Sequence, residues 1–422
     1  MRASSSKSST ALNPIELTLG IMTAVGGFVD ISQLVFSGQA GSMFGYSLIS
    51  AFAISTIGII VYGEMCGRVA AVAHQPLFSL MRHRLGLKLG LVTLIASFIS
   101  TLVTTAAEIG GLGMILNYLT GAPYLLMCVV STIALIATMW ILPFKWIERA
   151  YGLLGLFMVV FVVALVVVHP PWGKIAGGFV PQVPRGLSSK ELLNYSYFVV
   201  AIFSAVMFPY EAFFYSSGGI EEGWKPKDLL TNRVTSIMGM GLGSLLSIAI
   251  LALAALLFAP NDVAPQIPGS VALQTAIPLG KLGLVFALLG MLFAVAGAAV
   301  ETCMANAYSV SQFFGWDWGR HKKPWEAPRF TVSWIVMMLL ALAIVMTGVE
   351  VMNLVGYAVV FSILVLPLSY LPLMLLANDR SYMREYANKW LARTLGWLFF
   401  VIVTVCAVAA VPLYVLTSGG QG

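Results

Sequence analysis

Eleven long runs of apolar residues occupy most of the chain. They lie near residues 15–35, 43–67, 90–118, 123–142, 147–168, 195–220, 232–259, 279–312, 328–348, 351–376 and 394–417. A helix needs roughly 20 residues to cross the hydrocarbon core of a bilayer, and these runs approach or exceed that length. They are too long, and alternate too little, to be strands of a membrane barrel. We therefore predict an all-α polytopic membrane protein with about eleven transmembrane helices.

Composition agrees with this class. Charged residues make up 9% of the 422 residues and hydrophobic residues 59%, whereas an ordinary soluble domain is about 25% charged. The net charge of +6 would suit nucleic acid in a soluble protein, but here the Lys and Arg residues lie between the apolar runs. We expect a lipid-facing surface and no nucleic-acid partner. The polar N-terminus lacks the apolar core of a signal peptide, so the first run is expected to stay as a helix.

The positive residues also predict an orientation. With a cytoplasmic N-terminus, all but four of the 23 Lys and Arg residues fall on the cytoplasmic side, as the positive-inside rule requires. The four on the outer side are Lys174, Arg185, Lys190 and Lys281. Eleven spans then place the C-terminus outside. We expect a multi-pass protein of the plasma (inner) membrane.

The longest connector is rich in Pro and Gly and separates the fifth run from the sixth. This spacing suggests five spans, five more and one appended, as in membrane proteins built from inverted repeats with discontinuous helices. The predicted segments are a cytoplasmic tail (1–14), a first five-helix repeat (15–168), an extracellular connector (169–194), a second five-helix repeat (195–376), and a loop with the eleventh helix (377–422).

Five acidic residues interrupt the apolar runs: Asp30, Glu64, Glu108, Glu211 and Glu301. An acid at the centre of a span costs about 2.5–3.5 kcal/mol on insertion scales, so it persists where it is paired, solvated or bound to a cation. Glu64 precedes Arg68 by four residues and is interpreted as half of an ion pair at the membrane edge. Glu301 has small and polar neighbours and is a candidate for the inner pathway.

Two of these acids lie beside residues that break helices. Asp30 follows a Gly-Gly pair and precedes Ser32 and Gln33, which weakens the helix and leaves carbonyls free to face a cavity. Glu211 follows Pro209, which lacks a backbone donor. We predict breaks in the first and sixth spans. The alternative for Asp30 is a helix cap with no further role, and a Pro kink alone is also common in structural spans.

These motifs resemble the Nramp family of divalent metal transporters. DISQ followed by QAGSMFGY in the first run is similar to the family's DPGN motif and its tail, FPYE in the sixth is similar to MPHN, and TTAAEIGG is similar to a third-span acidic segment. The resemblance covers most of the chain. It implies a LeuT-like fold of 5+5 helices plus one, with helices 1 and 6 broken. It also implies that the chain is no enzyme and uses no cofactor, because the metal is the transported substrate.

The family's site residues carry over to five positions by resemblance, four as metal ligands and one as a pathway residue. Asp30 would be the central carboxylate and Gln33 would replace an Asn ligand. Carbonyls of Gly27 and Ala205 would line the unwound segments, and Glu108 would be the acid below the site. The departures are Phe208 for a Met ligand, Tyr210 for His, Glu211 for Asn, Thr105 for Asp, Ile31 for the Pro of DPGN, and no glutamine near Val359.

The loss of the thioether predicts a hard site. Sulfur helps a site retain soft metals, whereas two carboxylates and neutral oxygens suit Mg²⁺ or Mn²⁺. We expect a partly hydrated ion held by Asp30, Gln33, Glu211 and backbone carbonyls, as the resemblance to the divergent Nramp-related magnesium transporters implies. Met207, one residue before Phe208, is expected to pack in the core because Pro209 fixes the register. Phe208 is either a space filler or a gating residue.

Proton coupling is expected to be weak or absent. His74, His83, His169 and His321 fall in loops or at span ends, where they cannot relay protons mid-membrane. Alternatives to an uncoupled carrier are a proton-coupled Mn²⁺/Fe²⁺ transporter, an amino-acid carrier of the same architecture and a cation channel. The four single cysteines are expected to be packing residues, and the protein a monomer or weak oligomer.

Overall fold

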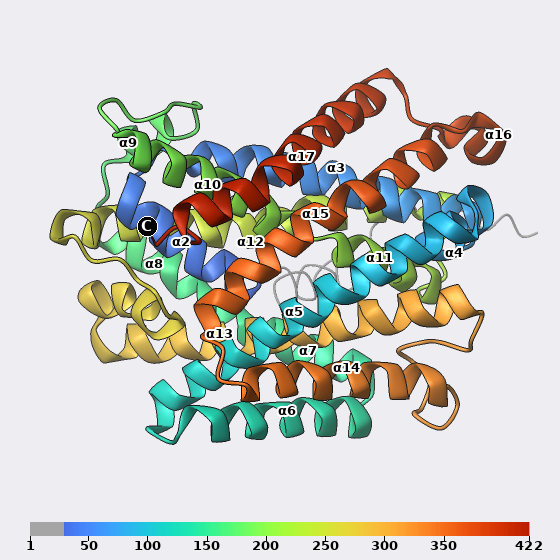
Figure 1. Ribbon diagram of the computed structural model, residues 1–422, viewed down its shortest axis with the longest axis horizontal. Coiled ribbons are helices and arrows are strands. Elements are labelled where there is room, and N and C mark those ends of the chain that lie inside the picture. The colour runs from blue at the N-terminus through green and yellow to red at the C-terminus, as the bar shows by residue number, and fades with distance from the viewer. Residues whose placement is uncertain (1–28, 422) are drawn as a thin grey trace, which may run out of the picture.

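The computed structural model describes residues 29–421, and helices account for nearly all of that part of the chain (Figure 1). The α-helices are α2 (Ile31–Phe44), α3 (Ile49–Ala73), α4 (Leu77–Leu85), α5 (Leu87–Thr120), α6 (Tyr124–Ile141), α7 (Phe144–Gly155), α8 (Val160–Val167), α9 (Trp172–Gly177), α10 (Ser189–Val206), α11 (Pro209–Glu221), α12 (Leu229–Leu257), α13 (Pro268–Phe314), α14 (Pro328–Met346), α15 (Val351–Asn378), α16 (Arg380–Met383) and α17 (Trp390–Thr417). Short 3-10 turns occupy Leu156–Val159, Pro226–Asp228, Ala259–Asn261 and Arg384–Tyr386.

Ten helical stretches within residues 29–421 are long and apolar enough to span a membrane. They correspond to the predicted runs from the second to the eleventh. Two of them combine consecutive helices: α7 and α8 form one span, and α10 and α11 form another that is interrupted in the middle. The predicted all-α membrane fold is confirmed. The start of the first predicted run, and the 1–14 tail, lie outside the described residues.

Some helix ends differ from the prediction. The first span was expected to end near residue 35 and the second to begin near 43, but α2 continues to Phe44 and α3 begins at Ile49. Gly45 ends α2 with a φ of 60°, a conformation that glycine adopts readily. The sixth span begins at Ser189, not near 195, because Ser188 and Glu191 form a capping box.

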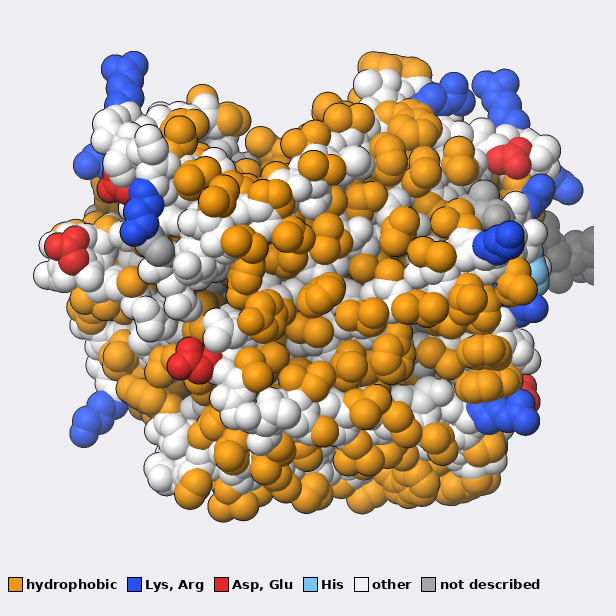
Figure 2. All heavy atoms as spheres, in the orientation of Figure 1, with side chains coloured by type: hydrophobic (Ala, Val, Ile, Leu, Met, Phe, Trp, Pro, Cys, Tyr) orange, Lys and Arg blue, Asp and Glu red, His pale blue; other side chains and the backbone are white. Residues whose placement is uncertain are grey.

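The surface has the distribution expected of a protein in a bilayer. Figure 2 shows a broad hydrophobic band across the middle of the molecule, with Lys and Arg side chains mainly toward the two ends of its long axis. The outward face of α17 illustrates the band, since Val401, Val405 and Val408 are 56%, 62% and 74% exposed. Apolar side chains on this scale are stable in contact with lipid. The orientation and the boundaries of the two repeats stay predictions.

The inner helices place the start of α2 next to the break between α10 and α11. The helix α2 packs against α12, α10 and α13, while α5 packs against α13 and α15. Gly41 allows the close approach of α2 to α12, because a Cβ there would lie 2.1 Å from the carbonyl oxygen of Leu251. The hydroxyl of Ser204 in α10 donates to the carbonyl oxygen of Val359 in α15 at 2.6 Å. These contacts hold the start of α2 and the end of α10 inside the helix bundle.

Candidate metal-binding site

The helix α2 begins at an acidic cap. Asp30 is in an extended conformation, and its Oδ1 accepts a hydrogen bond from the backbone N–H of Gln33 at 2.7 Å. Its other oxygen, Oδ2, is buried and has no hydrogen-bond partner among the described residues. The free N–H groups and the dipole of a helix N-terminus favour a negative charge here. Asp30 is therefore a cap with one oxygen left for another partner.

Glu108 lies beside this helix start. Its Oε1 accepts a hydrogen bond from the backbone N–H of Ile31 at 3.4 Å, whereas its Oε2 is buried without a partner in the described part of the chain. Gly111, one turn further along α5, leaves room for Ile31, because a Cβ at Gly111 would lie 2.7 Å from the Ile31 Cδ1. Ile31 at the position of the family's Pro is thus compatible with the start of a helix.

The predicted break in the sixth span lies at two residues. Met207 has φ −119° and ψ 60°, and Phe208 has φ −70° and ψ 134°, so the chain is extended between α10 and α11. Pro209 is the first residue of α11. In a continuous helix the carbonyl of Ala205 would accept from the N–H of residue 209, and Pro has none. The Ala205 carbonyl is left without this bond, as its predicted role requires.

Glu211 occupies the first turn of α11 and is 4% exposed. Its Oε2 has no partner among residues 29–421, nor has the Oε1 of the buried Gln33. The Glu211 carboxyl group lies within electrostatic range of both Asp30 and Glu301. The starts of α2 and α11 therefore each present a buried carboxyl group, and the two groups are close enough to interact.

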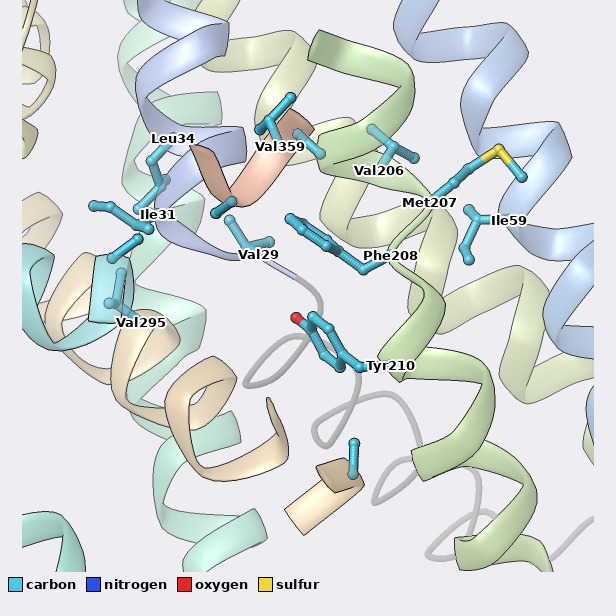
Figure 3. Close-up of a cluster of buried hydrophobic side chains, with 14 of the residues drawn as sticks. Val29, Ile31, Leu34, Ile59, Val206, Met207, Phe208, Tyr210, Val295 and Val359 are labelled. Carbon is cyan, nitrogen blue, oxygen red and sulfur yellow. The ribbon is translucent and has the colours of Figure 1, made fainter. Parts of the chain in front are cut away.

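The residues of the break point in different directions (Figure 3). The Phe208 ring extends toward Val29 and Val359, while Met207 points the other way, toward Ile59 of α3. The Met207 side chain is fully buried, and a Cβ on Gly58 would lie 2.7 Å from its sulfur. This placement agrees with the expectation that Met207 packs in the core.

The aromatic pair follows the break. The rings of Phe208 and Tyr210 are 5.2 Å apart between centroids, and both side chains are buried. Val359 of α15 lies close to Phe208. The side chains nearest the break are therefore apolar or aromatic, and the polar atoms come from the acids, Gln33 and backbone carbonyls.

The arrangement suits a cation held partly through water. Within residues 29–421, no three His, Cys, Asp or Glu side chains are grouped as direct metal ligands. The available donors are oxygens of Asp30, Glu211, Gln33 and Ala205, which is a hard donor set. Gly27, the other predicted carbonyl ligand, lies outside the described residues.

The remaining predicted residues are placed as follows. The Thr105 hydroxyl donates to the Thr101 carbonyl of its own helix at 2.8 Å, so it is already occupied. Glu301 is 5% exposed, and its Oε2 has no partner in the described chain. The pair of Glu64 and Arg68 is present, with Oε1 and Nε 3.0 Å apart. All four cysteines are free and buried, which agrees with a packing role.

Two polar clusters had no signal in the sequence. Arg320, in the loop after α13, binds Glu148, Glu221 and Glu222 at 3.0, 3.3 and 2.7 Å. The Tyr62 hydroxyl donates to Ser369 Oγ at 2.7 Å. The partners lie far apart in sequence, 172 residues for Arg320 and Glu148 and 307 for Tyr62 and Ser369. No local pattern reveals such pairs.

Comparisons with known proteins cover nearly the whole chain. The sequence profile described as natural resistance-associated macrophage protein-like, Nramp, matches residues 20–412. The divalent metal cation transporter MntH of Latilactobacillus sakei is 24% identical over 402 residues, covering 92% of this chain and 86% of the relative.

Solved structures show the same fold. The manganese transporter of Eremococcus coleocola superposes with a TM-score of 0.77 at 20% identity, covering 96% of this chain and 87% of the other. MhsT in complex with L-phenylalanine gives 0.63 at 16% identity, covering 95% and 98%. The fold is LeuT-like, and the Latilactobacillus sakei and Eremococcus coleocola proteins are named as transporters, not enzymes. The broken sixth span and the profile match over residues 20–412 together establish that this chain is a member of the Nramp family.

Proposed function

We propose that the chain is a secondary carrier of divalent metal ions that works by alternating access, with Mg²⁺ as its main substrate and Mn²⁺ also carried. The observation that supports this most directly is the pair of buried carboxyl groups of Asp30 and Glu211 at the starts of α2 and α11, each with an oxygen that has no partner among residues 29–421. The relatives named as a divalent metal cation transporter and as a manganese transporter support the same substrate class.

The preference for Mg²⁺ rests on the donor set. The ring of Phe208 lies at the break where a thioether would otherwise stand, and the sulfur of Met207 points away from it. Two carboxylates balance a divalent charge, and Mg²⁺ favours oxygen ligands while keeping several of its waters. Mn²⁺ accepts the same oxygen donors.

Weak or absent proton coupling is the second part of the proposal. All four histidines lie outside the ten candidate spans: His74 caps α3, His83 is in the short helix α4, and the other two are in loops. Thr105 cannot exchange a proton near neutral pH, and its hydroxyl is bonded within its own helix. A proton path therefore lacks the side chain best suited to it.

The remaining parts of the proposal concern the cell. We place the protein in the plasma membrane with the N-terminus inside and the C-terminus outside, as a monomer or weak oligomer. The asymmetric distribution of Lys and Arg supports this orientation.

The test is flux into proteoliposomes. Mg²⁺ uptake, with Mn²⁺, Ca²⁺ and a proton dye followed in parallel, is expected to be saturable, slow and accompanied by little proton entry. Asp30→Ala and Glu211→Ala are expected to abolish it, while Glu350→Ala, an exposed acid before α15, serves as the matched control.

Each contrary result points to a different function. Stoichiometric proton entry with Mn²⁺ would favour a proton-coupled Mn²⁺/Fe²⁺ transporter. Single-channel events would favour a cation channel, and amino-acid uptake would favour an amino-acid carrier of the same architecture. Unchanged Mg²⁺ flux in both site variants would remove the proposed site.

A further inference from the structure

A small cavity lies between α7 and α13. It has a volume of about 20 Å³, and its lining includes Glu148 of α7 and Glu301 of α13. A space of ~10–15 Å³ already accommodates one water-sized particle. The cavity can therefore hold a single water or a single small ion.

Glu301, which lines this cavity, has one carboxyl oxygen without a hydrogen-bond partner among the described residues. Glu301 is 5% exposed, and its Oε2 makes no hydrogen bond within residues 29–421. A buried carboxylate with an oxygen free is costly unless a proton, a water or a cation is bound to it. Phe144, Ile147 and Val300 in the lining are apolar, and the hydroxyl of Tyr151, also in the lining, makes no hydrogen bond to this oxygen.

Glu148, the other acid in the lining, connects the cavity to the loop after α13. Glu148 is 17% exposed and pairs with Arg320 Nη1 at 3.0 Å. Arg320 is itself shared with Glu221 and Glu222, and its guanidinium stacks 5.1 Å from the centre of the Phe144 ring. Three carboxylates bound to a single guanidinium, with Glu301 nearby, leave this region with excess negative charge.

The acids form a series between the central site and this loop. Asp30 is within electrostatic range of Glu211, Glu211 of Glu301, and Glu301 of Glu148. The four acids come from four helices. Asp30 lies at the start of α2, Glu211 is in α11, Glu301 in α13 and Glu148 in α7. A cation leaving the central site toward this end of the molecule would meet a negative group at each step.

We propose that Glu301 and Glu148 form a second site for the transported divalent cation, an exit site between the central site and the loop that carries Arg320. This proposal rests on the proposed function for the identity of the ion. Oxygen donors again suit Mg²⁺ or Mn²⁺. Arg320 repels the ion that the carboxylates attract, so the site binds weakly, as a transit site must if the ion is to leave.

Counting bound Mn²⁺ by EPR on the purified full-length chain tests this inference, because the signal of free Mn²⁺ is lost on binding. We expect the wild type to bind about two ions per chain, one tightly and one weakly. Glu301→Gln and Glu148→Gln should each remove the weak step alone, while Asp30→Ala with Glu211→Ala should remove the tight step alone. Glu326→Gln, an exposed acid next to the same loop, should change neither.

The outcomes separate the exit site from the proposed function. If the weak step persists in both Glu301→Gln and Glu148→Gln, the exit site is wrong. If the central variants retain every step while Glu301→Gln loses one, the exit site stands and the central site fails. Glu301→Asp should restore the weak step, which a merely structural role for Glu301 would not predict. Should Glu301→Gln fail to fold, the less buried Glu148→Gln carries the test.

Discussion

At the scale of single residues, Asp30 has two oxygens with different tasks. Oδ1 caps α2 through the N–H of Gln33, whereas Oδ2 is buried without a partner among the described residues. A capping role would need only the first oxygen. The second is what a metal ion would bind, and the free oxygens of Glu108 and Glu211 strengthen the negative potential around it.

Asp30→Asn separates these two tasks. Asn caps a helix about as well as Asp, so the free energy of unfolding should change by less than ~0.5 kcal/mol. The loss of the charge should weaken Mg²⁺ binding by at least about tenfold, or ~1.4 kcal/mol. Thermal unfolding in detergent and isothermal titration calorimetry measure the two quantities. Unchanged binding would make Asp30 a cap only.

Phe208→Met restores sulfur at the break. A thioether favours softer transition metals over Mg²⁺, so the ratio of Mn²⁺ to Mg²⁺ affinity should rise by about tenfold. Competition of the two ions for uptake into proteoliposomes measures the ratio. Met207→Leu is the matched control, since this sulfur points toward Ile59 and its loss should leave selectivity unchanged. If Phe208→Met leaves the ratio as it was, Phe208 is a space filler.

At the scale of the helices, the break between α10 and α11 depends on one missing donor. Pro209 cannot give an N–H to the Ala205 carbonyl, and Phe208 before it is extended, as residues before proline tend to be. The break therefore leaves the Ala205 carbonyl without its helical hydrogen bond. It also places Tyr210 and Glu211 in the first turn of α11. A continuous helix would turn these groups to other faces.

Pro209→Ala should therefore favour a continuous helix. We expect uptake to fall by about tenfold while the free energy of unfolding stays the same or rises by ~1 kcal/mol, because a backbone hydrogen bond is gained. Flux and thermal unfolding measured on one preparation provide both numbers. Pro412→Ala in the lipid-facing helix α17 is the control and should leave flux intact. Full activity in Pro209→Ala would show that the break does not depend on proline.

At the scale of the whole molecule, the charges at the two ends and the apolar band between them define how the protein sits in a membrane. The more basic end includes Lys389 and the loop with Arg320, and the other end includes Lys190. The positive-inside rule assigns the first end to the cytoplasm. The proposed exit site lies on the cytoplasmic side of the central site only if this orientation is correct.

Labelling with a membrane-impermeant thiol reagent tests the orientation. The four native cysteines are buried, so a cysteine introduced at exposed Lys190 should react in intact cells, and one at exposed Lys389 only after the membrane is opened. The reverse pattern would invert the assignment of inside and outside. Labelling of both positions in intact cells would contradict the odd number of spans, five, between the loop with Lys190 and the loop with Lys389.

The sequence alone determined the membrane class, the spans and the position of the break at Pro209, because hydropathy and the chemistry of proline are local properties. The acids of the proposed central site were identified for the same reason, since a carboxylate in an apolar run is costly wherever the helix lies. Helix ends such as Phe44 and Ser189 were placed several residues away, because a glycine turn and a capping box decided them.

Only the tertiary structure decided which side chains meet. The opposite directions of Met207 and Phe208 depend on non-helical backbone angles that no periodic pattern encodes. The pairing of Arg320 with Glu148 joins residues 172 positions apart, and Glu301 meets the same cavity only because α13 packs against α7. Local sequence determines where a polar group costs free energy, whereas packing between distant helices determines which partner or ion compensates for it.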